Sequence, residues 1–243
     1  MTEVSIIIPT YNEARYLSQT LVPLTSLNPL AYEIIVVDGS SSDRTRQVAQ
    51  NFPVTVLTSN IARRSLQMNL GAQMAQGYYL CFLHADTLVP EDLITQIRKT
   101  LANEKVALGG FISLMKGQQI RWLPTSLNYL KTYWAPLIYQ PYRFLFKGLR
   151  LLFGDQVMFC RRTDFLSCGG FDPNLPIMEE ADICLRMNRL GSIKQIRRTV
   201  ISSDRRLSQW GHFKAHIIWI GVCILWSLRV SPHWLKRFYE EVR

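Results

Sequence analysis

Short hydrophobic runs alternate with helical patterns along the first hundred residues. Four runs of β-branched and aromatic side chains predict buried strands at residues 4–8, 33–37, 54–57 and 78–83. Helical segments are predicted at 16–24, in the stretch that ends at 51, and at 65–75. Because strands that are buried on both faces belong to parallel sheets covered by helices, this alternation predicts a doubly wound α/β sheet of the nucleotide-binding type.

The alternation continues in the second half of the chain. Strands are expected at 106–114, 155–160 and 193–203, and helices at 88–102, 163–167, 180–190 and 215–228. A last short helix is expected to begin at Ser231 and Pro232. The apolar segment 215–228 is too short to span a bilayer and is predicted to be a buried or interfacial helix.

Two carboxylates directly follow predicted strands. Asp86 comes after the run 78–83, and Asp38 comes after 33–37 beside Gly39 and a row of serines. Ligands of open α/β sheets bind at the carboxyl edge of the strands, so Asp86 could handle a metal or a phosphate, and Asp38 a base or a ribose. Asp86 could equally cap the helix that starts near Pro90, and Asp38 could belong to a capped turn. The residues alone leave both alternatives open.

The segment 116–153 has an unusual composition. No Asp or Glu occurs between Lys105 and Gly154, while aromatic residues alternate with Arg and Lys. Aromatic rings and basic side chains are both favoured at a membrane interface, so the segment could bind an anionic membrane surface. A flap that packs its apolar face on the sheet is the competing interpretation and is slightly favoured.

Composition narrows the class of protein further. The chain has 243 residues, 48% of them hydrophobic, which suffices for one α/β domain with a sizeable core. The formal charge of +10 and the pI near 9.6 point to an anionic partner, and because no nucleic-acid motif occurs, a phosphorylated ligand or a membrane surface is preferred. Five cysteines without a CxxC pair predict reduced core thiols and a cytoplasmic location, and the N-terminus shows no secretory signal.

Six short motifs together resemble a known family. Residues 8–13 (IPTYNE), 38–45 (DGSSSDRT) and 82–87 (FLHADT) are similar to family 2 glycosyltransferases with the GT-A fold. Residues 154–156 (GDQ), 169–171 (GGF) and 178–182 (MEEAD) resemble the acceptor-side half of a small bacterial subgroup, often labelled arsenosugar-biosynthesis-type glycosyltransferases. The similarity covers roughly the whole chain in the right order, which is more specific than any single motif. It implies an inverting transfer of a sugar from a nucleotide-diphosphate donor, aided by a divalent cation, Mg²⁺ or Mn²⁺.

The resemblance also implies roles for individual residues. Asp86 takes the last position of the family's DxD-like element and would be the main metal ligand, while His84 replaces the first carboxylate and would be a softer second ligand. Arg205 and Arg206 would bind the donor diphosphate, although such arginines are as often only solvated. The remaining donor-binding residues would be Pro9, Thr10, Tyr11, Glu13 and Asp38 for the base and ribose, and Arg64, Gln67 and Asn69 in a donor loop.

For the chemical step, the resemblance points to Glu180, which stands where the family's Glu-Asp pair carries its Asp. An inverting displacement needs a carboxylate on the acceptor side as general base. Glu179 or Asp155 could reach the acceptor hydroxyl instead. Acids in the first turn of a helix also simply complement the helix dipole, which requires no catalysis.

We therefore expect one α/β domain of the GT-A type, a Rossmann-like and mostly parallel sheet flanked by helices. Its parts would be a nucleotide-sugar-binding half (1–115), an amphipathic insertion (116–153), an acceptor or catalytic half (154–208) and a helical tail (209–243). The expected activity is hexosyl transfer from a nucleotide sugar to an acceptor that the sequence leaves open, a lipid-linked one included. The protein would be cytoplasmic, either free or peripheral at the membrane, with no nucleic-acid partner.

One alternative function comes from departures from the family pattern. His84, Glu180 and Leu207 replace residues that the family or its subgroup leads us to expect. A nucleotide-sugar-binding protein with little or no turnover is therefore the competing hypothesis. A nucleotidyltransferase would need a basic, glycine-rich phosphate loop near the N-terminus, and the sequence contains none.

Overall fold

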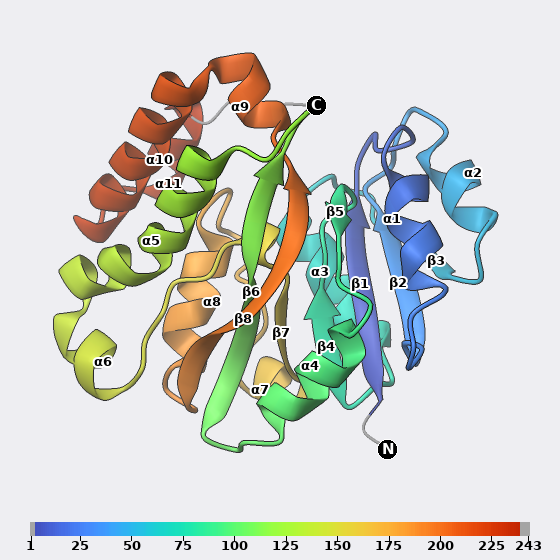
Figure 1. Ribbon diagram of the computed structural model, residues 1–243, viewed down its shortest axis with the longest axis horizontal. Helices are drawn as coiled ribbons and strands as arrows, with labels where there is room; N and C mark the ends of the chain where they lie inside the picture. Colours follow the sequence, from blue (N-terminus) through green and yellow to red (C-terminus); the bar gives the residue numbers. More distant parts are fainter. Residues whose placement is uncertain (1–2, 239–243) are drawn as a thin grey trace.

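The first half of the chain forms one side of a continuous eight-stranded sheet (Figure 1). The computed structural model describes residues 3–238, apart from the side chains of Arg206, Leu207, Gln209, His212, Phe213 and His216. The elements of this half are β1 Val4–Thr10, α1 Leu17–Leu24, β2 Glu33–Asp38, α2 Thr45–Gln50, β3 Thr55–Thr58, α3 Arg64–Met74 and β4 Tyr79–Phe82. The four strands are parallel and lie in the order β3-β2-β1-β4. The predicted doubly wound arrangement is confirmed.

The second half completes the sheet with strands of mixed direction. Its elements are β5 Thr87–Leu88, α4 Leu93–Leu101, β6 Val106–Lys116, the 3-10 turn η1 Gly154–Gln156, β7 Met158–Arg161, α7 Arg162–Ser167, α8 Glu179–Met187 and β8 Ser192–Ser203. Strand β7 runs antiparallel to both β4 and β6, whereas the long strands β6 and β8 are parallel to each other. The complete order is β3-β2-β1-β4-β7-β6-β8-β5.

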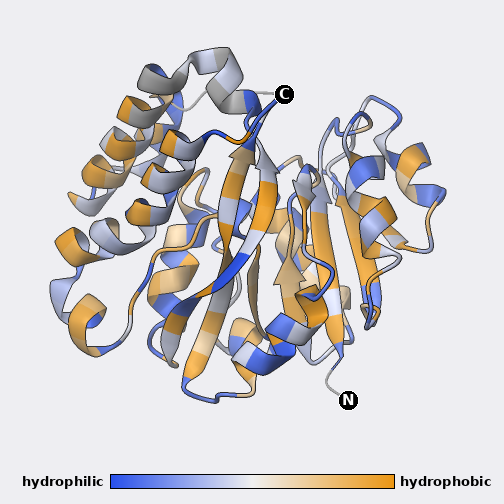
Figure 2. Cartoon of the chain, viewed as in Figure 1, coloured by the Kyte–Doolittle hydropathy of each residue, from blue (hydrophilic) through white to orange (hydrophobic). Residues whose placement is uncertain are grey.

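Hydrophobic side chains cover both faces of the sheet at its central strands, and Figure 2 shows β1 and β2 as mostly apolar, whereas β8 contains a hydrophilic stretch. Successive residues of a strand point to opposite faces. In β1, Ile7 packs in the cluster that contains Met68 of α3, whereas Ile6 and Ile8 pack in the cluster that contains Leu21 of α1. Burial on both sides explains why the sequence shows continuous apolar runs instead of alternation.

The segment 116–153 and the C-terminal tail form a helical group beside β6 and β8 (Figure 1). Its elements are α5 Trp122–Tyr139, α6 Pro141–Phe146, α9 Arg205–Trp210, α10 His212–Ser227, α11 Pro232–Leu235 and the 3-10 turn η2 Lys236–Phe238. Helix α5 packs on β6, and the Met115 N–H donates to the Thr125 hydroxyl at 3.0 Å. Helices α5 and α10 lie side by side, with the rings of Tyr139 and Trp226 5.2 Å apart. One face of α5 thus covers the sheet, but the residues that it buries are small or polar, so the flap interpretation, which placed an apolar face on the sheet, is not confirmed.

Several predicted element boundaries differ from those of the structure, two of them for an identifiable reason. The strand expected at 155–160 begins only at Met158, because the preceding residues form η1 and Val157 has a left-handed backbone with φ of 50°. The helix expected from residue 88 begins at Leu93, since Thr87–Leu88 pair with β8 instead. Asp92 occupies the N-cap position of α4, so Asp86 does not cap this helix.

All five cysteines are free thiols, and four of them are buried, which confirms the predicted core thiols. Within the described residues, the helices lack the combination of length and hydrophobicity that crossing a membrane requires. The apolar α10 extends over 16 residues and lies against α5.

Candidate active site

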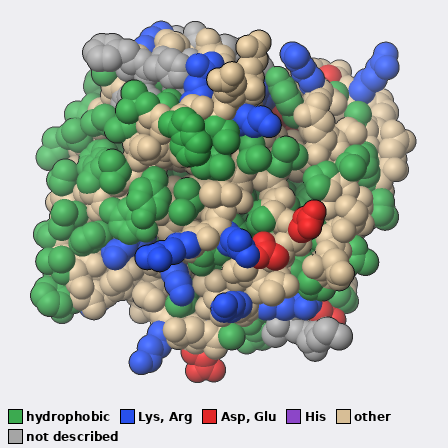
Figure 3. Space-filling view, in the orientation of Figure 1, with side chains coloured by type: hydrophobic (Ala, Val, Ile, Leu, Met, Phe, Trp, Pro, Cys, Tyr) green, Lys and Arg blue, Asp and Glu red, His purple; other side chains and the backbone are tan. Residues whose placement is uncertain are grey.

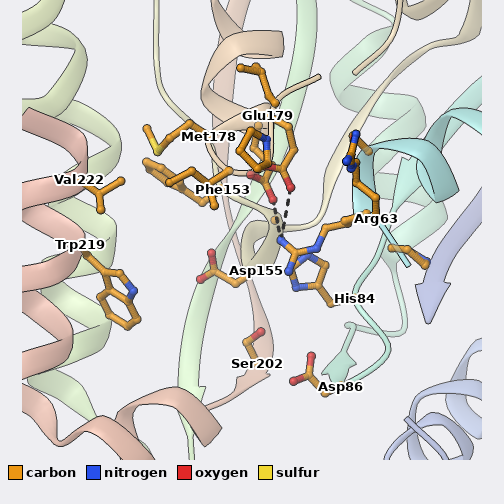
Figure 4. Close-up of a pocket in the computed structure, with 18 of the residues that line it drawn as sticks. Arg63, His84, Asp86, Phe153, Asp155, Met178, Glu179, Ser202, Trp219 and Val222 are labelled. Carbon is orange, nitrogen blue, oxygen red and sulfur yellow. Dashed lines mark hydrogen bonds and ion pairs between the residues drawn. The ribbon is translucent and has the colours of Figure 1, made fainter. Parts of the chain in front are cut away.

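A cleft with a volume of about 360 Å³ opens at the carboxyl edge of the sheet, where the sheet meets the helical group (Figure 4). Its wall includes the ends of β1 and β8, the segment after β4, the first turns of α3 and α8, and parts of α5 and α10. The predicted site residues in this wall are Pro9, Thr10, Tyr11, Arg64, Gln67, His84, Asp86, Asp155, Glu179, Glu180 and Arg205. Glu13, Asp38 and Asn69 do not line the cleft, and the side chain of Arg206 lies outside the described residues.

Asp38 is fully buried and organises the loop after β2. Its carboxylate accepts hydrogen bonds from the Thr10 hydroxyl at 3.2 Å and from the Ser41 N–H at 2.9 Å. The Gln67 side-chain amide donates to the carbonyls of Thr10 and Val37, both at 2.7 Å. These bonds join α3 to the ends of β1 and β2, so both side chains hold the cleft wall at the end of β1 in place through the backbone.

Asn69 holds a distant loop in place. Its amide donates to the Phe171 carbonyl at 2.7 Å and accepts from the Phe171 N–H at 2.9 Å. Gly170 has a φ of 67°, and a Cβ at this position would approach the Asn69 side-chain oxygen to 2.7 Å, so the close contact requires glycine. The structure thus gives Asn69 a structural contact, in place of the position in the cleft that the resemblance implies.

Arg205, the first residue of α9, connects two carboxylates at the edge of the sheet. Its guanidinium donates to both Glu13 oxygens, at 2.9 and 3.0 Å, and to Asp86 Oδ2 at 2.7 Å. The guanidinium also lies 4.7 Å from the centre of the Tyr16 ring. Burial raises the pKa of Glu13, and the bonds from Arg205 counteract this rise. Arg205 is therefore held by an ion-pair network, unlike a merely solvated arginine.

Asp86 and His84 both face the cleft, as the metal-site prediction requires (Figure 4). Within the described residues, no cluster of three or more His, Cys, Asp and Glu side chains could enclose a metal ion. Mg²⁺ is commonly bound by one or two carboxylates together with substrate phosphates and water, so a full protein cage is not needed. A cationic guanidinium already lies against Asp86 Oδ2. The donor set thus fits a divalent cation that takes its other ligands from the substrate and water.

Two adjacent carboxylates begin α8 on another wall of the cleft. Arg64 Nη1 lies 3.1 Å from Glu180 Oε1 and 3.8 Å from Glu179 Oε1, and Figure 4 shows both contacts as dashed lines. Both side chains are almost fully buried. Burial, and next the neighbouring Glu180 charge, raises the pKa of Glu179 to about 7, although Arg64 opposes this shift. Met178 precedes them in a left-handed conformation with φ of 66°.

Asp155 lies on η1, between the sheet-edge acids and the helical group. Its Oδ2 accepts a hydrogen bond of 2.6 Å from the Asn128 amide of α5. Asn128 and Lys131 line the cleft one helical turn apart, and sequence reasoning missed them because it considered the segment only as a membrane-binding surface or as a flap over the sheet. Their polarity within an aromatic helix is the signal that could have identified them. The wall formed by Trp219, Val222 and Cys223 of α10 had no such signal.

The sheet order, with a polar cleft at its carboxyl edge where open α/β sheets bind ligands, is that of the GT-A class of α/β folds. The model of the family described as Glycosyl transferase family 2 matches residues 5–170. This is more than half of the chain, and the chain belongs to this family. The narrower resemblance to the arsenosugar-type subgroup stays a prediction.

Relatives of known sequence agree with the family assignment. An uncharacterized glycosyltransferase of Haemophilus influenzae is 28% identical over 141 residues, which are 54% of this chain and 56% of that protein. A dolichol-phosphate mannosyltransferase of Pyrococcus furiosus is 32% identical over 119 residues, which are 44% of this chain and 32% of that protein. The match thus spans little more than half of the first relative and about a third of the second.

Solved structures share the fold over nearly the whole chain. A mannosyltransferase from Pyrobaculum calidifontis, in complex with GDP-Man and Mn²⁺, has a TM-score of 0.69 and 19% identity, covering 95% of this chain and 65% of that one. Glucosyl-3-phosphoglycerate synthase from Mycobacterium tuberculosis, in complex with Mn²⁺, UDP and phosphoglyceric acid, has a TM-score of 0.65 and 16% identity, covering 95% and 80%. At such identities the likeness establishes the GT-A fold.

Proposed function

We propose that the protein transfers a sugar from a nucleoside-diphosphate donor to an acceptor hydroxyl with inversion at the anomeric carbon. One observation carries this proposal: Asp86 and the Glu179–Glu180 pair reach the same cleft from the end of β4 and from the start of α8. A carboxylate for the diphosphate side and a carboxylate for the acceptor side are the two groups that such a displacement needs. The donors and Mn²⁺ of the structural neighbours support the same assignment.

On the donor side, the residues of this chain bind and orient the nucleoside-diphosphate sugar. The end of β1, held against β2 by Gln67, forms the wall for the base and ribose. Asp86, with His84 as the second ligand, would hold the divalent cation, which neutralises diphosphate charge when bound. Arg205 brings a guanidinium to the same place, and its fork geometry suits phosphate oxygens.

On the acceptor side, Glu180 acts as the general base. It takes the proton of the acceptor hydroxyl while the hydroxyl oxygen bonds to the anomeric carbon and the bond from this carbon to the diphosphate oxygen breaks. The products are the glycosylated acceptor and the nucleoside diphosphate. Arg64 orients the Glu180 carboxylate at 3.1 Å, and Glu179 beside it has a pKa of about 7, suited to exchanging the proton near neutral pH.

The acceptor is proposed to be lipid-linked. The cleft wall opposite the sheet edge is apolar where α10 contributes Trp219 and Val222, and basic where it contains Lys131 and Lys236. An amphipathic molecule with an anionic head would match this combination. The free thiols support a reducing, cytoplasmic setting for the reaction.

Product stereochemistry tests the proposal. The protein would be incubated with UDP-, GDP- and dTDP-sugars, Mn²⁺ and short-chain lipid phosphates or sugar acceptors, and the anomeric configuration of any product determined by NMR. A product of inverted configuration is expected. A retained configuration would overturn the mechanism, while a donor that binds but is never consumed with any acceptor would favour the binding-protein alternative.

A further inference from the structure

Exposed hydrophobic side chains gather on the outer side of the helical group (Figure 3). Among the described residues, fifteen of the twenty-four exposed large hydrophobic side chains lie at 122–146 or 217–238. Helix α6 has no buried residue, and its Phe146 and Leu145 are 73% and 62% exposed. Scattered exposed hydrophobic residues are ordinary, but a contiguous patch marks an interaction site.

Helix α5 buries and exposes the opposite kinds of side chain from an ordinary surface helix. A surface helix buries its large hydrophobic residues and exposes its polar ones. The buried positions of α5 are small or polar: Pro124, Thr125, Asn128, Thr132, Ala135 and Pro136. Its exposed positions include large hydrophobic residues: Trp122, Leu123, Leu130, Leu137 and Ile138. These side chains therefore contribute little to the core.

The same helices carry only positive charge. The sequence has no Asp or Glu between Lys105 and Gly154, and none between Arg205 and Tyr239. These two stretches are far apart in the chain, yet they meet where α5 packs beside α10. Figure 3 shows Lys and Arg side chains along the border of the hydrophobic area. Two identical faces of this kind would repel each other, which disfavours a second copy as the partner.

We infer that this surface, the apolar face, docks on an anionic membrane. The apolar face comprises the exposed hydrophobic residues of α5, α6 and α10 together with Leu228, Trp234 and Phe238. Its aromatic and aliphatic side chains enter the boundary between headgroups and acyl chains, while the surrounding Lys and Arg attract the lipid phosphates. Because α10 also forms a wall of the cleft, docking brings the cleft to the bilayer. Only the delivery of a lipid-linked acceptor rests on the proposed function.

Vesicle flotation of the whole protein, without donor or cation, tests docking separately from catalysis. Vesicles of phosphatidylcholine with phosphatidylglycerol should bind the protein at low salt and release most of it at high salt, and pure phosphatidylcholine should bind it weakly. The double variant Leu145→Ser/Phe146→Ser should lose about tenfold or more in affinity. Leu166→Ser/Leu190→Ser changes two exposed leucines outside the apolar face and should bind as the wild type does.

Charge variants give a second comparison. Lys147→Gln/Lys214→Gln removes two exposed charges near the apolar face and should weaken vesicle binding about tenfold. The control is Lys99→Gln/Lys194→Gln, which removes two exposed charges on α4 and β8 and should have little effect on vesicle binding. If the wild type stays unbound with anionic vesicles at low salt, docking is overturned. It is also overturned if sedimentation shows a dimer that Leu145→Ser/Phe146→Ser dissociates while vesicles capture nothing. Neither result changes donor binding or product stereochemistry, which test the proposed function.

Discussion

Glu180 and Glu179 share one arginine, and substitution separates their roles. We expect Glu180→Gln to lose about 100- to 10,000-fold in kcat with nearly unchanged donor affinity, because the amide keeps the shape but accepts no proton. Glu179→Gln is the matched control, since it changes the neighbouring carboxylate, which lies farther from Arg64. Steady-state kinetics measures kcat of both variants, and titration with the donor measures their donor affinity. Near-normal turnover in Glu180→Gln with an inactive Glu179→Gln would assign the base to the preceding residue.

The raised pKa of Glu179 makes a prediction about stability and pH. A carboxyl group whose pKa is about 7 in the folded state and 4.5 in the reference state binds more protons when folded between these values. Its stabilising contribution is therefore complete below pH 4.5 and is lost as pH rises through 7. We expect Glu179→Gln to stabilise the protein relative to the wild type at pH 8 and to show a smaller gain at pH 5. Urea unfolding at both pH values measures this difference, and an equal effect at both would contradict it.

At the scale of elements, Arg205 fastens α9 to the segments after β1 and β4. Arg205→Gln leaves the partly buried Glu13 carboxylate without its bidentate partner, so the free energy of unfolding should fall by about 1–3 kcal/mol. The control is Arg198→Gln, whose pair with Asp92 is more exposed and should contribute no more than about 1 kcal/mol. Urea unfolding measures both variants. If the free energy of unfolding falls equally in the two, the Arg205 network stabilises the fold no more than an exposed ion pair does.

Asn69 links α3 to the loop before Phe171, whereas the resemblance implies that it binds the donor. A substitution can distinguish the structural role from the donor-binding role. Asn69→Ala removes both hydrogen bonds to the Phe171 backbone and should lower the free energy of unfolding by about 1–3 kcal/mol. Donor affinity should change little, because the side chain lies outside the cleft wall. Isothermal titration with the donor, alongside thermal unfolding, separates these effects. A stable variant with strongly weakened donor binding would restore the role that the resemblance implies.

The elements that sequence reasoning predicted well are those whose pattern depends on burial alone. Strands β1, β2 and β4 are continuous apolar runs because helices cover both faces of the sheet. The predicted start of β7 was wrong because Val157 has a left-handed backbone, and the sequence gives no local signal for that conformation at a β-branched residue. Boundaries that depend on one backbone torsion are thus less predictable than strands that depend on many buried side chains.

For the whole molecule, the residues that follow β1 and β4 came together in one cleft because parallel strands end at a common edge, whereas Asp38 at the end of β2 lies outside the cleft wall. Partnerships between distant residues could not be predicted in this way. Asn69 and Phe171 are 102 positions apart, and Arg205 and Glu13 are 192 apart. No local pattern encodes such pairs, since they arise only when the second half of the chain packs on the first. The apolar face is similar, because composition singled out the segment 116–153, but only the packing of α5 beside α10 shows which side remains exposed and that α10 contributes to it.

Donor and cation should stabilise the whole fold together. A ligand that binds only the folded state, present at 100 times its Kd, adds about 2.7 kcal/mol, which corresponds to a rise in Tm of about 5–10 °C for a chain of this size. We expect one nucleotide sugar to give this shift with Mn²⁺ and to lose most of it in EDTA. In Asp86→Asn the shift should be small with or without Mn²⁺, while the unliganded Tm stays close to that of the wild type because Glu13 still holds Arg205 bidentately. Scanning calorimetry of both proteins provides the measurement. A full shift in EDTA would mean that Arg205 alone neutralises the diphosphate, and that the carboxylate at the end of β4 serves to position this guanidinium and does not bind a metal.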